Sequence, residues 1–244
     1  PENLEDLIQE VIETDADLGL AFDGDGDRLG VVDNNGRIIW ADHQMMLYAM
    51  DVLSRNKGAK VIYDVKCTSL LPKLISENGG NPILSRTGHS FIKKKLKETN
   101  AELAGEMSGH IFFKERWYGF DDALYTGARL LEIVSNSDKT CSEIFDELPV
   151  NLSTPEININ FEKHGQQYEA MESLSNNIDF PDASVNTIDG FRVDYEDCWG
   201  LVRPSNTTPC LVLRFEGTGV AELNKIQERF KKWLEGSGIP AENL

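Results

Sequence analysis

The sequence predicts an α/β fold, in which a mixed, mostly parallel βαβ region precedes a C-terminal α+β region with an antiparallel sheet. Short apolar runs alternate with helix-periodic segments up to residue 134. This alternation is typical of βαβ units, whose parallel sheet is covered by helices on both faces. After Pro149 the runs alternate with period two, as the strands of a half-exposed sheet do. A length of 244 residues suits one to two domains and does not exclude three.

The opening segments predict one helix and three strands. Residues 3–13 carry apolar side chains at helical spacing, and residues 18–22 and 29–33 are short apolar runs typical of strands. Residues 34–36 (NNG) predict a turn, after which residues 37–40 continue as a strand. The stretch between the first two strands is rich in aspartate and glycine, so it is the first candidate for a site.

The central segments alternate between strands and helices. We expect strands over residues 59–65, 81–85 and 101–104. We expect helices over residues 43–54, 69–77, 91–98 and 121–134. Ser90 is expected to cap the third of these helices. Because ligands of such sheets bind at the carboxyl ends of the strands, the loops that follow the strands are the expected place of a site.

The closing segments predict an antiparallel sheet with two helices. We expect strands over residues 156–161, 187–195, 200–202 and 210–216. We expect helices over residues 168–176 and 221–234.

The composition favours a folded, acidic protein. Lys and Arg number 24 against 41 Asp and Glu, which gives a net charge of −17. This acidity argues against a nucleic-acid surface, but it leaves room for an anionic ligand in a local basic pocket. No apolar run approaches the ~18 residues of a membrane span, and no signal-peptide pattern is present. The four cysteines lack the spacing of a disulfide framework or a zinc site. We therefore expect a cytoplasmic protein with neither a nucleic-acid nor a membrane partner.

The loop DGDGDR is the sharpest chemical feature. Asp23, Asp25 and Asp27 alternate with glycines, which let the backbone turn so that the carboxylates converge. Three such charges repel each other without a cation, and carboxylate oxygens are the ligands that Mg²⁺ prefers. An EF-hand loop is excluded, because Arg28 and Asn34 stand where it needs Gly and Glu. The remaining alternative is an acidic turn that holds no metal.

The loop GEMSGH suggests a polyol site. Glu106, Ser108 and His110 alternate after a strand, so in extended backbone all three side chains point to one side. Carboxylate and hydroxyl oxygens can bind sugar hydroxyls, and the imidazole can act as an acid or a base. Taken alone, the same pattern also fits a solvated loop.

The loop RPSNTTP suggests an anion site. Arg203 offers a forked pair of donors to a phosphate, while Ser205, Asn206, Thr207 and Thr208 add hydroxyl and amide donors. Their backbone amides can also form an anion-binding nest. The alternative is a polar surface turn, because turns use the same residue types.

Two further residues fall at the ends of strands. Lys66 follows the strand predicted over residues 59–65, at the carboxyl end where α/β sites form. His89 precedes a helix and could reach an anion near the helix N-terminus, although an ordinary loop histidine fits equally well. Residues 114–122 (KERWYGFDD) are either a mobile cover or plain aromatic packing.

The three loops, in this order, resemble the α-D-phosphohexomutase superfamily, and more closely its bacterial phosphomannomutase/phosphoglucomutase branch. The shorter motifs DVKCT, TGHS, KERW and WGLVR also fit that branch. Met107 stands where phosphoglucosamine mutases typically carry Gln, and the pair Asn206-Thr207 likewise resembles the mannose/glucose branch. A phosphoglucosamine mutase is therefore the second choice.

The resemblance implies three domain parts and a catalytic cycle. Residues 1–37 would be the end of the second domain with the metal loop, residues 38–149 the third domain with the sugar loop, and residues 150–244 the fourth domain with the phosphate loop. The implied reaction interconverts hexose 1-phosphate and hexose 6-phosphate through an enzyme phosphoserine and glucose or mannose 1,6-bisphosphate. The phosphoserine loop is absent from this sequence, which starts without Met. We therefore expect a piece of a longer mutase that needs its N-terminal domains, or else a non-catalytic phosphosugar-binding module.

The resemblance also implies a role for each site residue. Asp23, Asp25 and Asp27 match ligands of one Mg²⁺ ion. Arg28 matches a residue beside the reactive phosphate, Lys66 and His89 match cleft residues, and His110 matches a candidate acid/base. Glu106 and Ser108 match contacts to the sugar hydroxyls. The residues that match the site of the non-transferred phosphate are Arg203, Ser205, Asn206, Thr207 and Thr208.

Overall fold

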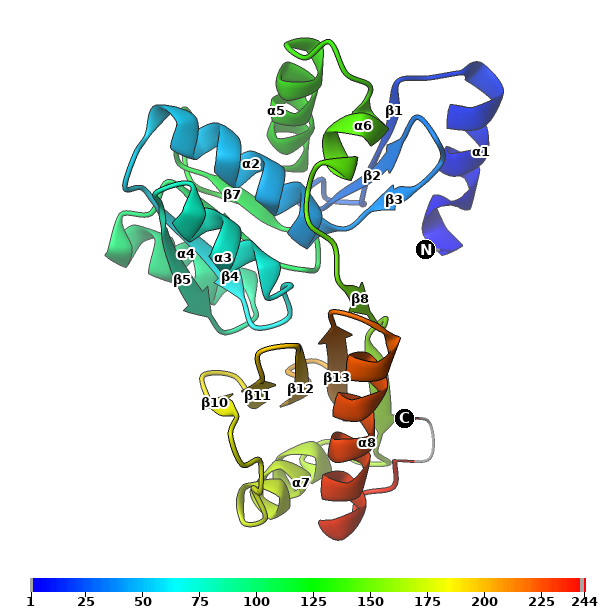
Figure 1. The fold of residues 1–244 in the computed structure, drawn as a ribbon, viewed down its shortest axis with the longest axis vertical. Helices are drawn as coiled ribbons and strands as arrows, with labels where there is room; N and C mark the ends of the chain where they lie inside the picture. Colours follow the sequence, from blue (N-terminus) through cyan, green and yellow to red (C-terminus); the bar gives the residue numbers. More distant parts are fainter. Residues whose placement is uncertain (1, 242–243) are drawn as a thin grey trace. The chain divides into compact units, whose positions relative to one another are not determined.

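A computed structural model describes residues 2–241 and 244 of the chain. The contacts divide it into two compact units, one that ends at Pro149 and one that begins at Val150. Each unit has its own hydrophobic core. Figure 1 shows the helices and strands of each unit. No helix in the described part of the chain is long and apolar enough to cross a membrane.

A small antiparallel sheet opens the first unit. Its strands β1 (Leu18–Phe22), β2 (Leu29–Asp33) and β3 (Ile38–Ile39) pair in the order β1-β2-β3. The short 3₁₀ helix η1 (Glu2–Leu4) and the helix α1 (Glu5–Thr14) precede the sheet, and α1 packs against β1 and β2 (Figure 1). The connection from β1 to β2 is the aspartate-rich loop, which therefore projects from one end of this sheet.

A four-stranded sheet in the order β5-β4-β6-β7 forms the centre of the first unit. Three strands are parallel, and β7 returns antiparallel to β6. The strands are β4 (Lys60–Asp64), β5 (Asn81–Ser85), β6 (Leu103–Gly105) and β7 (Ile111–Phe113). The helices of this unit are α2 (Ala41–Arg55), α3 (Leu70–Glu77), α4 (His89–Thr99), α5 (Ala123–Ser135) and α6 (Cys141–Asp146).

Helices cover both faces of this sheet. Successive side chains of a strand point to opposite faces, so neighbouring residues of β4 contact different helices. Val61 and Tyr63 of β4 belong to the core that contains the buried residues of α2, α3 and α5. Ile62, between them, belongs to a second cluster with Ile92 and Leu96 of α4. The loops at the carboxyl ends of β4, β5 and β6 lie where the ligands of such sheets bind.

The second unit is an antiparallel sheet backed by two helices. The strand order is β10-β11-β12-β13-β8, and β9 also pairs with β13. The strands are β8 (Leu152–Ser153), β9 (Ile157–Asn160), β10 (Ser184–Asn186), β11 (Phe191–Asp194), β12 (Cys198–Pro204) and β13 (Cys210–Gly217). The helices are α7 (Gln166–Ser175) and α8 (Val220–Gly236), and aromatic side chains of α8 pack on the sheet. The predicted mixed α/β class, with a parallel region and an antiparallel region, is confirmed.

Several element boundaries differ from those predicted. The helix α4 begins at His89 with Gly88 as its N-cap, so Ser90 lies inside the first turn and the predicted cap is wrong. The predicted strand over residues 187–195 is the shorter strand β11, because residues 187–190 form the turn that joins β10 to β11. The strands β7, β8 and β10 and the helix α6 were not expected at all.

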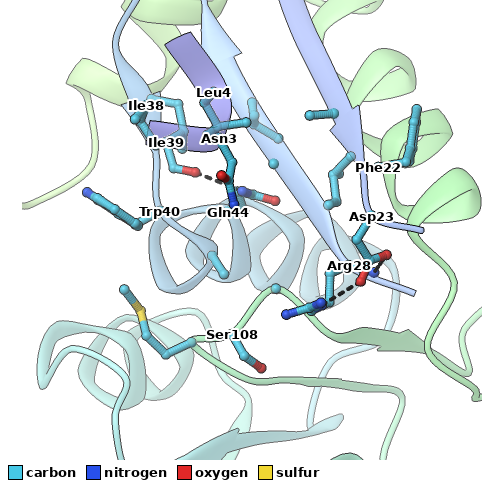
Figure 2. A pocket seen from close by; sticks show the side chains of 17 residues that line it. Asn3, Leu4, Phe22, Asp23, Arg28, Ile38, Ile39, Trp40, Gln44 and Ser108 are labelled. Atoms are coloured by element: carbon cyan, nitrogen blue, oxygen red, sulfur yellow. Dashed lines mark hydrogen bonds and ion pairs between the residues drawn. The ribbon is translucent and has the colours of Figure 1, made fainter. Parts of the chain in front are cut away.

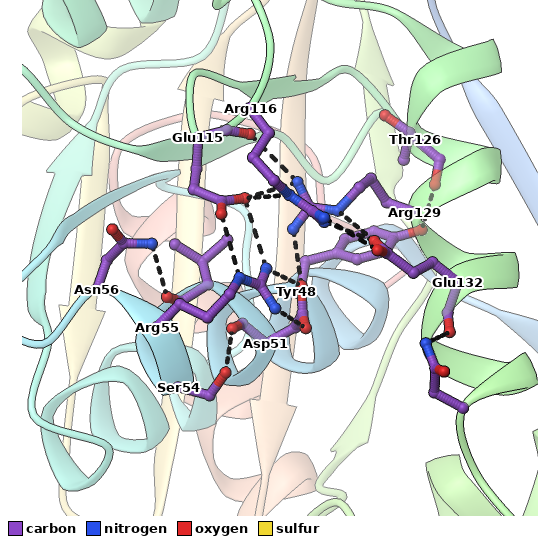
Figure 3. A network of polar contacts seen from close by, with 12 residues as sticks. Tyr48, Asp51, Ser54, Arg55, Asn56, Glu115, Arg116, Thr126, Arg129 and Glu132 are labelled. Carbon is purple, nitrogen blue, oxygen red and sulfur yellow. Dashed lines mark hydrogen bonds and ion pairs between the residues drawn. The ribbon is translucent and has the colours of Figure 1, made fainter.

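A network of ion pairs joins α2, α5 and the connection from β7 to α5 (Figure 3). Arg129 of α5 lies at its centre and is only 3% exposed. Its guanidinium nitrogens lie 2.7 Å from an Asp51 carboxylate oxygen and 2.8 Å from a Glu115 carboxylate oxygen. Arg55 contacts the same two carboxylates, and the guanidinium of Arg129 also lies 4.4 Å from the ring centre of Phe113. The network therefore fixes the start of the 114–122 segment to two helices.

Candidate functional site

The aspartate-rich loop is built around the Asp23 carboxylate. Its Oδ1 accepts hydrogen bonds from the backbone N–H groups of Asp27 and Arg28, and its Oδ2 accepts one from the Arg28 Nε at 2.5 Å. The loop turns at Gly26, whose φ of +73° is a conformation that side-chain-bearing residues rarely adopt. The carboxylate oxygens of Asp23, Asp25 and Asp27 consequently lie within 4.8 Å of one another.

This donor set fits a hard divalent cation. Burial opposes the ionisation of Asp23, but the hydrogen bonds from Arg28 outweigh it and lower the pKa of Asp23 to about 2. The carboxylate is therefore charged at neutral pH, as a metal ligand must be. Three oxygen ligands from one loop leave positions for phosphate oxygens and water, which suits Mg²⁺. A second group, Asp27, His110 and Asp121, has its ligand atoms equally close, but its imidazole nitrogen suits Mg²⁺ less well.

The structure brings the aspartate-rich loop and the GEMSGH loop into direct contact. The backbone N–H of Leu29 donates to the Gly109 carbonyl at 3.4 Å, and Arg28 and His110 form an isolated β-bridge. The His110 Nε2 lies 3.4 Å from the Asp27 Oδ2. Figure 2 shows Asp23, Arg28 and Ser108 around one cavity of about 430 Å³. Two loops that are some eighty residues apart in the chain thus share one site.

The GEMSGH loop is a turn, which corrects the prediction of extended backbone. The Gly109 N–H donates to the Glu106 carbonyl, and the Glu106 N–H donates to the His110 carbonyl at 2.9 Å. Gly109 adopts a φ of +100°. The three predicted side chains still meet, since the His110 Nδ1 lies 2.9 Å from the Ser108 Oγ and 3.4 Å from a Glu106 carboxylate oxygen. Burial lowers the pKa of His110, although the negative charges of Asp27 and Asp121 oppose this shift.

Glu106 lies in an environment that favours its protonated form. The side chain is 1% exposed, and its Oε1 accepts a hydrogen bond from the Gly88 N–H at 2.5 Å. Burial, together with the nearby negative charge of Asp64, raises the pKa of Glu106 to about 7, although the Gly88 bond and the charge of Lys66 oppose the rise. Near neutral pH the carboxyl group can therefore either donate or accept a hydrogen bond, which suits a sugar hydroxyl.

Glu106→Gln is expected to make the stability of the chain less dependent on pH. The pKa of Glu106 is about 7 in the folded chain against an ordinary value of 4.5, so the unfolded chain releases a proton that the folded chain keeps. The stabilising contribution of this group is complete below its unfolded pKa and is lost as the pH rises through about 7. The free energy of unfolding in urea should decline less between about pH 5 and about pH 8 in the glutamine variant than in the wild type. Glu77→Gln, at an exposed position of α3, should behave like the wild type, and equal declines for all three chains would contradict the assignment.

His89 lies beside the GEMSGH loop and is held by a residue that the sequence did not single out. The rings of His89 and His110 stack with their centres 5.6 Å apart. The Asp121 carboxylate, which is 7% exposed, lies 3.2 Å from the His89 Nδ1 and 2.9 Å from the Lys93 Nζ. We predicted Asp121 only as the start of a helix; the helix begins at Ala123, and Asp121 instead faces the two histidines. The alternating carboxylate and imidazole groups can hold or pass a proton.

Lys66 and the 114–122 segment also belong to the first unit. Lys66 is 6% exposed and lies two residues after Asp64, the last residue of β4. Within the segment, Trp117 stacks on Tyr125 with ring centres 4.2 Å apart and donates from Nε1 to Asp122. Tyr118 is 80% exposed. Trp117 thus follows the packing alternative, while the tip of the segment faces solvent.

The RPSNTTP loop lies in the second unit, between β12 and β13. The Ser205 Oγ accepts from the backbone N–H groups of Thr207 and Thr208 and lies 2.8 Å from the Thr208 Oγ1. These two N–H groups point to Ser205 and do not form the open nest that we expected. Asn206 at the tip is exposed. Arg203 is 5% exposed, and its Nε donates to the Asp189 carboxylate at 2.9 Å.

One nitrogen of the Arg203 guanidinium is unsatisfied. Its Nη2 is buried and has no hydrogen-bond partner within the described residues. A buried guanidinium nitrogen without a partner is costly, and a phosphate oxygen would satisfy it in the forked geometry that arginine favours. The arrangement of Arg203 with Ser205, Asn206, Thr207 and Thr208 is thus compatible with an anion site.

The chain matches three family models. "Phosphoglucomutase/phosphomannomutase, alpha/beta/alpha domain III" matches residues 40–152, "Phosphoglucomutase/phosphomannomutase, C-terminal domain" matches residues 156–232, and "Phosphoglucomutase/phosphomannomutase, alpha/beta/alpha domain II" matches residues 1–36. The chain is 56% identical to a phosphomannomutase/phosphoglucomutase of Pseudomonas putida over 96% of its own length and 50% of the relative's. It is 56% identical to a phosphoglucomutase of Neisseria gonorrhoeae over 97% of its own length and 52% of the relative's.

Solved structures agree with these sequence relatives. A phosphoglucomutase/phosphomannomutase family protein from Burkholderia thailandensis is 53% identical and superposes with a TM-score of 0.92, over 98% of this chain and 50% of that protein. An N-acetylphosphoglucosamine mutase of Aspergillus fumigatus, solved in complex with GlcNAc-6P and magnesium, is 13% identical with a TM-score of 0.62 over 90% of this chain and 48% of that protein, and it shares the fold alone. The chain spans about half the length of the curated relatives it matches. With 56% identity and three domain models matched in order, the chain belongs to the phosphoglucomutase/phosphomannomutase family.

Proposed function

We propose that this chain supplies the metal, sugar and phosphate loops of a phosphomannomutase/phosphoglucomutase, an intramolecular phosphotransferase that interconverts hexose 1-phosphate and hexose 6-phosphate. The contact between the aspartate-rich loop and the GEMSGH loop carries the proposal. The Leu29–Gly109 hydrogen bond and the His110–Asp27 contact hold the two loops together, so the proposed cation site and the proposed polyol site would lie side by side. Phosphoryl transfer to a sugar hydroxyl needs these two sites as neighbours.

The aspartate-rich loop would hold the transferring phosphoryl group. Asp23, Asp25 and Asp27 would bind one Mg²⁺ ion, which when bound neutralises charge on phosphoryl oxygens. Arg28, fixed by its 2.5 Å bond to Asp23, would stand beside the reactive phosphate. Arg28 is half-exposed, so a phosphate can reach its outer nitrogens.

The GEMSGH loop would orient the sugar and accept the proton of its attacking hydroxyl. Glu106 and Ser108 would bind sugar hydroxyls, and the buried Lys66 would add a positive charge to the same side. His110 would take the proton from the attacking hydroxyl, with His89 stacked beside it. A base near neutral pKa that lies within reach of a hydroxyl is the requirement for this step.

The RPSNTTP loop would bind the phosphate that is not transferred. Anchoring the far end of the substrate turns binding energy into orientation of the reacting end. The two ends must exchange during a cycle that passes through glucose or mannose 1,6-bisphosphate. Hydroxyl and amide donors that can change partners, such as Ser205, Asn206, Thr207 and Thr208, suit both phosphates.

The proposal places the nucleophile outside this chain. The serine that carries the phosphoryl group would belong to N-terminal domains, with residues 1–37 as the end of the second domain, residues 38–149 as the third domain and residues 150–244 as the fourth. We also propose a cytoplasmic location, supported by four buried cysteine thiols that form no disulfide in the described part of the chain.

The test has two parts. The purified chain, given mannose 1-phosphate, Mg²⁺ and glucose 1,6-bisphosphate, should form no mannose 6-phosphate, because it lacks the serine. The coding sequence upstream of the Pro1 codon should continue through a Thr-Ala-Ser-His-like loop, and the protein made from the whole frame should turn over. Turnover by the chain alone would overturn the placement of the nucleophile, and a start codon directly before Pro1 would favour a binding module.

Arg203→Ala is expected to weaken the binding of both sugar phosphates. The substitution removes the forked donor, and a charge-assisted hydrogen bond is worth about 1.5–3 kcal/mol, so KM for each hexose phosphate should rise by roughly ten-fold or more at 1.4 kcal/mol per ten-fold. Steady-state kinetics of the whole-frame protein, or calorimetric titration of the chain with mannose 1-phosphate, measures this. Arg192→Ala, an equally buried arginine of β11 (4% exposed), is the matched control. An unchanged KM for Arg203→Ala would contradict the phosphate assignment.

A further inference from the structure

Asp64 has no role in the proposed function, yet it lies beneath the site. It is the last residue of β4, the strand that pairs with both β5 and β6. Its side chain is fully buried, with 0% of the residue exposed. A buried carboxylate is costly unless donors satisfy it. The identity of those donors therefore shows what the carboxylate holds in place.

The donors to Asp64 come from three different loops. Its Oδ2 accepts from the Thr87 Oγ1 at 2.9 Å, in the loop after β5. Its Oδ1 accepts from the Met107 N–H at 3.2 Å, in the loop after β6, and from the Cys67 Sγ at 3.2 Å, in the loop after β4 itself. One carboxylate thus joins all three loops that leave the carboxyl edge of the parallel sheet.

These contacts close a ring of hydrogen bonds around Glu106. Thr87, held by Asp64, precedes Gly88, whose N–H donates to the Glu106 Oε1 at 2.5 Å. Met107, which follows Glu106, donates its N–H back to Asp64. The ring fixes both the backbone of the GEMSGH loop and the orientation of the Glu106 carboxyl group.

We propose that Asp64 is a positioning residue: its carboxylate locks together the three loops that carry Lys66, His89 and Glu106, and so orients Glu106 toward the sugar. This inference rests on the proposed function for the identity of the sugar, but the ring of hydrogen bonds exists independently of it. A displacement of about 1 Å at a site of this kind can cost about 10²-fold in rate, so a buried residue that sets loop positions acts on the reaction without touching substrate.

Substitutions at Asp64 can separate geometry from charge. In Asp64→Asn, the amide oxygen still accepts from Met107 and Cys67, while the amide nitrogen can donate to the Thr87 hydroxyl, which is able to accept. The loops should stay in place while the negative charge beside Glu106 disappears. Asp64→Ala removes every acceptor, so the loops should separate.

The first measurement uses NMR of the 244-residue chain without ligand. The charged groups that face Glu106 are Asp64, Lys66, Asp121 and the His110 ring, which lies 3.4 Å away. Because the like charge of Asp64 is removed, Asp64→Asn should lower the pKa of Glu106 by about one unit, read from its ¹³C carboxyl titration. In Asp64→Ala the amide signals of Gly88 and Met107 should shift and exchange faster with solvent. An unchanged Glu106 titration in both variants, with unshifted amides in Asp64→Ala, would overturn the proposal.

The second measurement tests the consequence for substrate. Titration with mannose 1-phosphate should show a Kd raised by about ten-fold or more in Asp64→Ala and nearly restored in Asp64→Asn. Asp33→Ala is the matched control, because Asp33 is equally buried and also accepts hydrogen bonds from three donors. Those donors, two backbone N–H groups and the Arg37 Nε, belong to the turn that follows β2 and not to the loops of the site. It should lose stability without changing Glu106 or the Kd.

The two measurements also separate the two hypotheses. If the wild-type chain binds no sugar phosphate while the NMR changes appear as described, the proposed function fails and the positioning role of Asp64 stands. If Asp64→Ala does not fold, Thr87→Val removes one donor of the ring and should shift the Gly88 amide; an unshifted Gly88 amide in that variant would overturn the inference.

Discussion

Arg129→Met should lower the free energy of unfolding of the first unit by about 3–5 kcal/mol, the usual cost of removing one partner of a buried ion pair. The guanidinium is 3% exposed and lies within 2.8 Å of carboxylate oxygens of both Asp51 and Glu115. Methionine fills similar volume but leaves those carboxylates facing each other, with Arg55 in contact with both and Arg116 in contact with Glu115. Hydrogen exchange of α2 and α5 peptides at increasing urea concentration reports this unit separately from the second one.

The matched control for this prediction is Arg116→Met. Arg116 belongs to the same network (Figure 3), but it is 43% exposed; it pairs with the equally exposed Glu132 at 2.5 Å and reaches the Glu115 carboxylate only at 3.4 Å. An exposed pair is worth about 0–1 kcal/mol, so this variant should unfold almost like the wild type. Equal losses in the two variants would contradict the claim that burial makes the Arg129 contacts costly to break.

The Arg129 network also bears on the site through the chain that it anchors. Glu115 lies near the start of the 114–122 segment, and Asp121, which contacts His89 and Lys93, lies near its end. Loosening the segment in Arg129→Met should therefore change the chemical shifts of the His89 ring as well as the stability. Arg116→Met should leave that ring unchanged.

The sequence was sufficient where a segment's structure depends on its own residues. The strands β1, β2 and β5 were predicted at the bounds that they have, because each is an apolar run between turn residues. The strand β7 was missed, because Ile111–Phe113 follows the GEMSGH loop so closely that only its pairing with β6 makes it a strand. The helix α6 was missed because six residues are too few to show a helical period in the sequence.

The same distinction applies to the candidate site. Asp23, Asp25 and Asp27 could be singled out because their spacing brings the carboxylates together within one turn. Asp64 and Asp121 could not, because an acidic residue at the end of a strand or ahead of a helix is ordinary in an acidic chain. Their significance depends on donors that arrive from other loops, such as Thr87 and His89. Long-range contacts of this kind leave no local pattern in a single sequence.

The second large effect is expected at the aspartate-rich loop, where Asp25→Asn should lower the affinity of the chain for Mg²⁺ by more than 100-fold. Substitutions in the outer shell of a metal site already cost about 10–100-fold in affinity, and Asp25 would be a direct ligand. Asp25 is a better position for the substitution than Asp23, because Asp23 also accepts hydrogen bonds from the backbone of Asp27 and the side chain of Arg28. Calorimetric titration of the chain with MgCl₂ measures the loss, and Asp6→Asn, on the exposed face of α1, is the control.

Stability measurements give this prediction a second readout with the opposite sign. Without a cation, three carboxylates within 4.8 Å of one another repel, so Asp25→Asn should stabilise the metal-free chain slightly. With Mg²⁺ at about one hundred times its Kd, the wild type should gain about 2.7 kcal/mol, and the variant should gain almost nothing. The order of stability of the two chains should therefore reverse as Mg²⁺ is added. An acidic turn that holds no metal predicts no such reversal, because adding Mg²⁺ would then only screen the charges, and the variant would remain the more stable chain at every concentration.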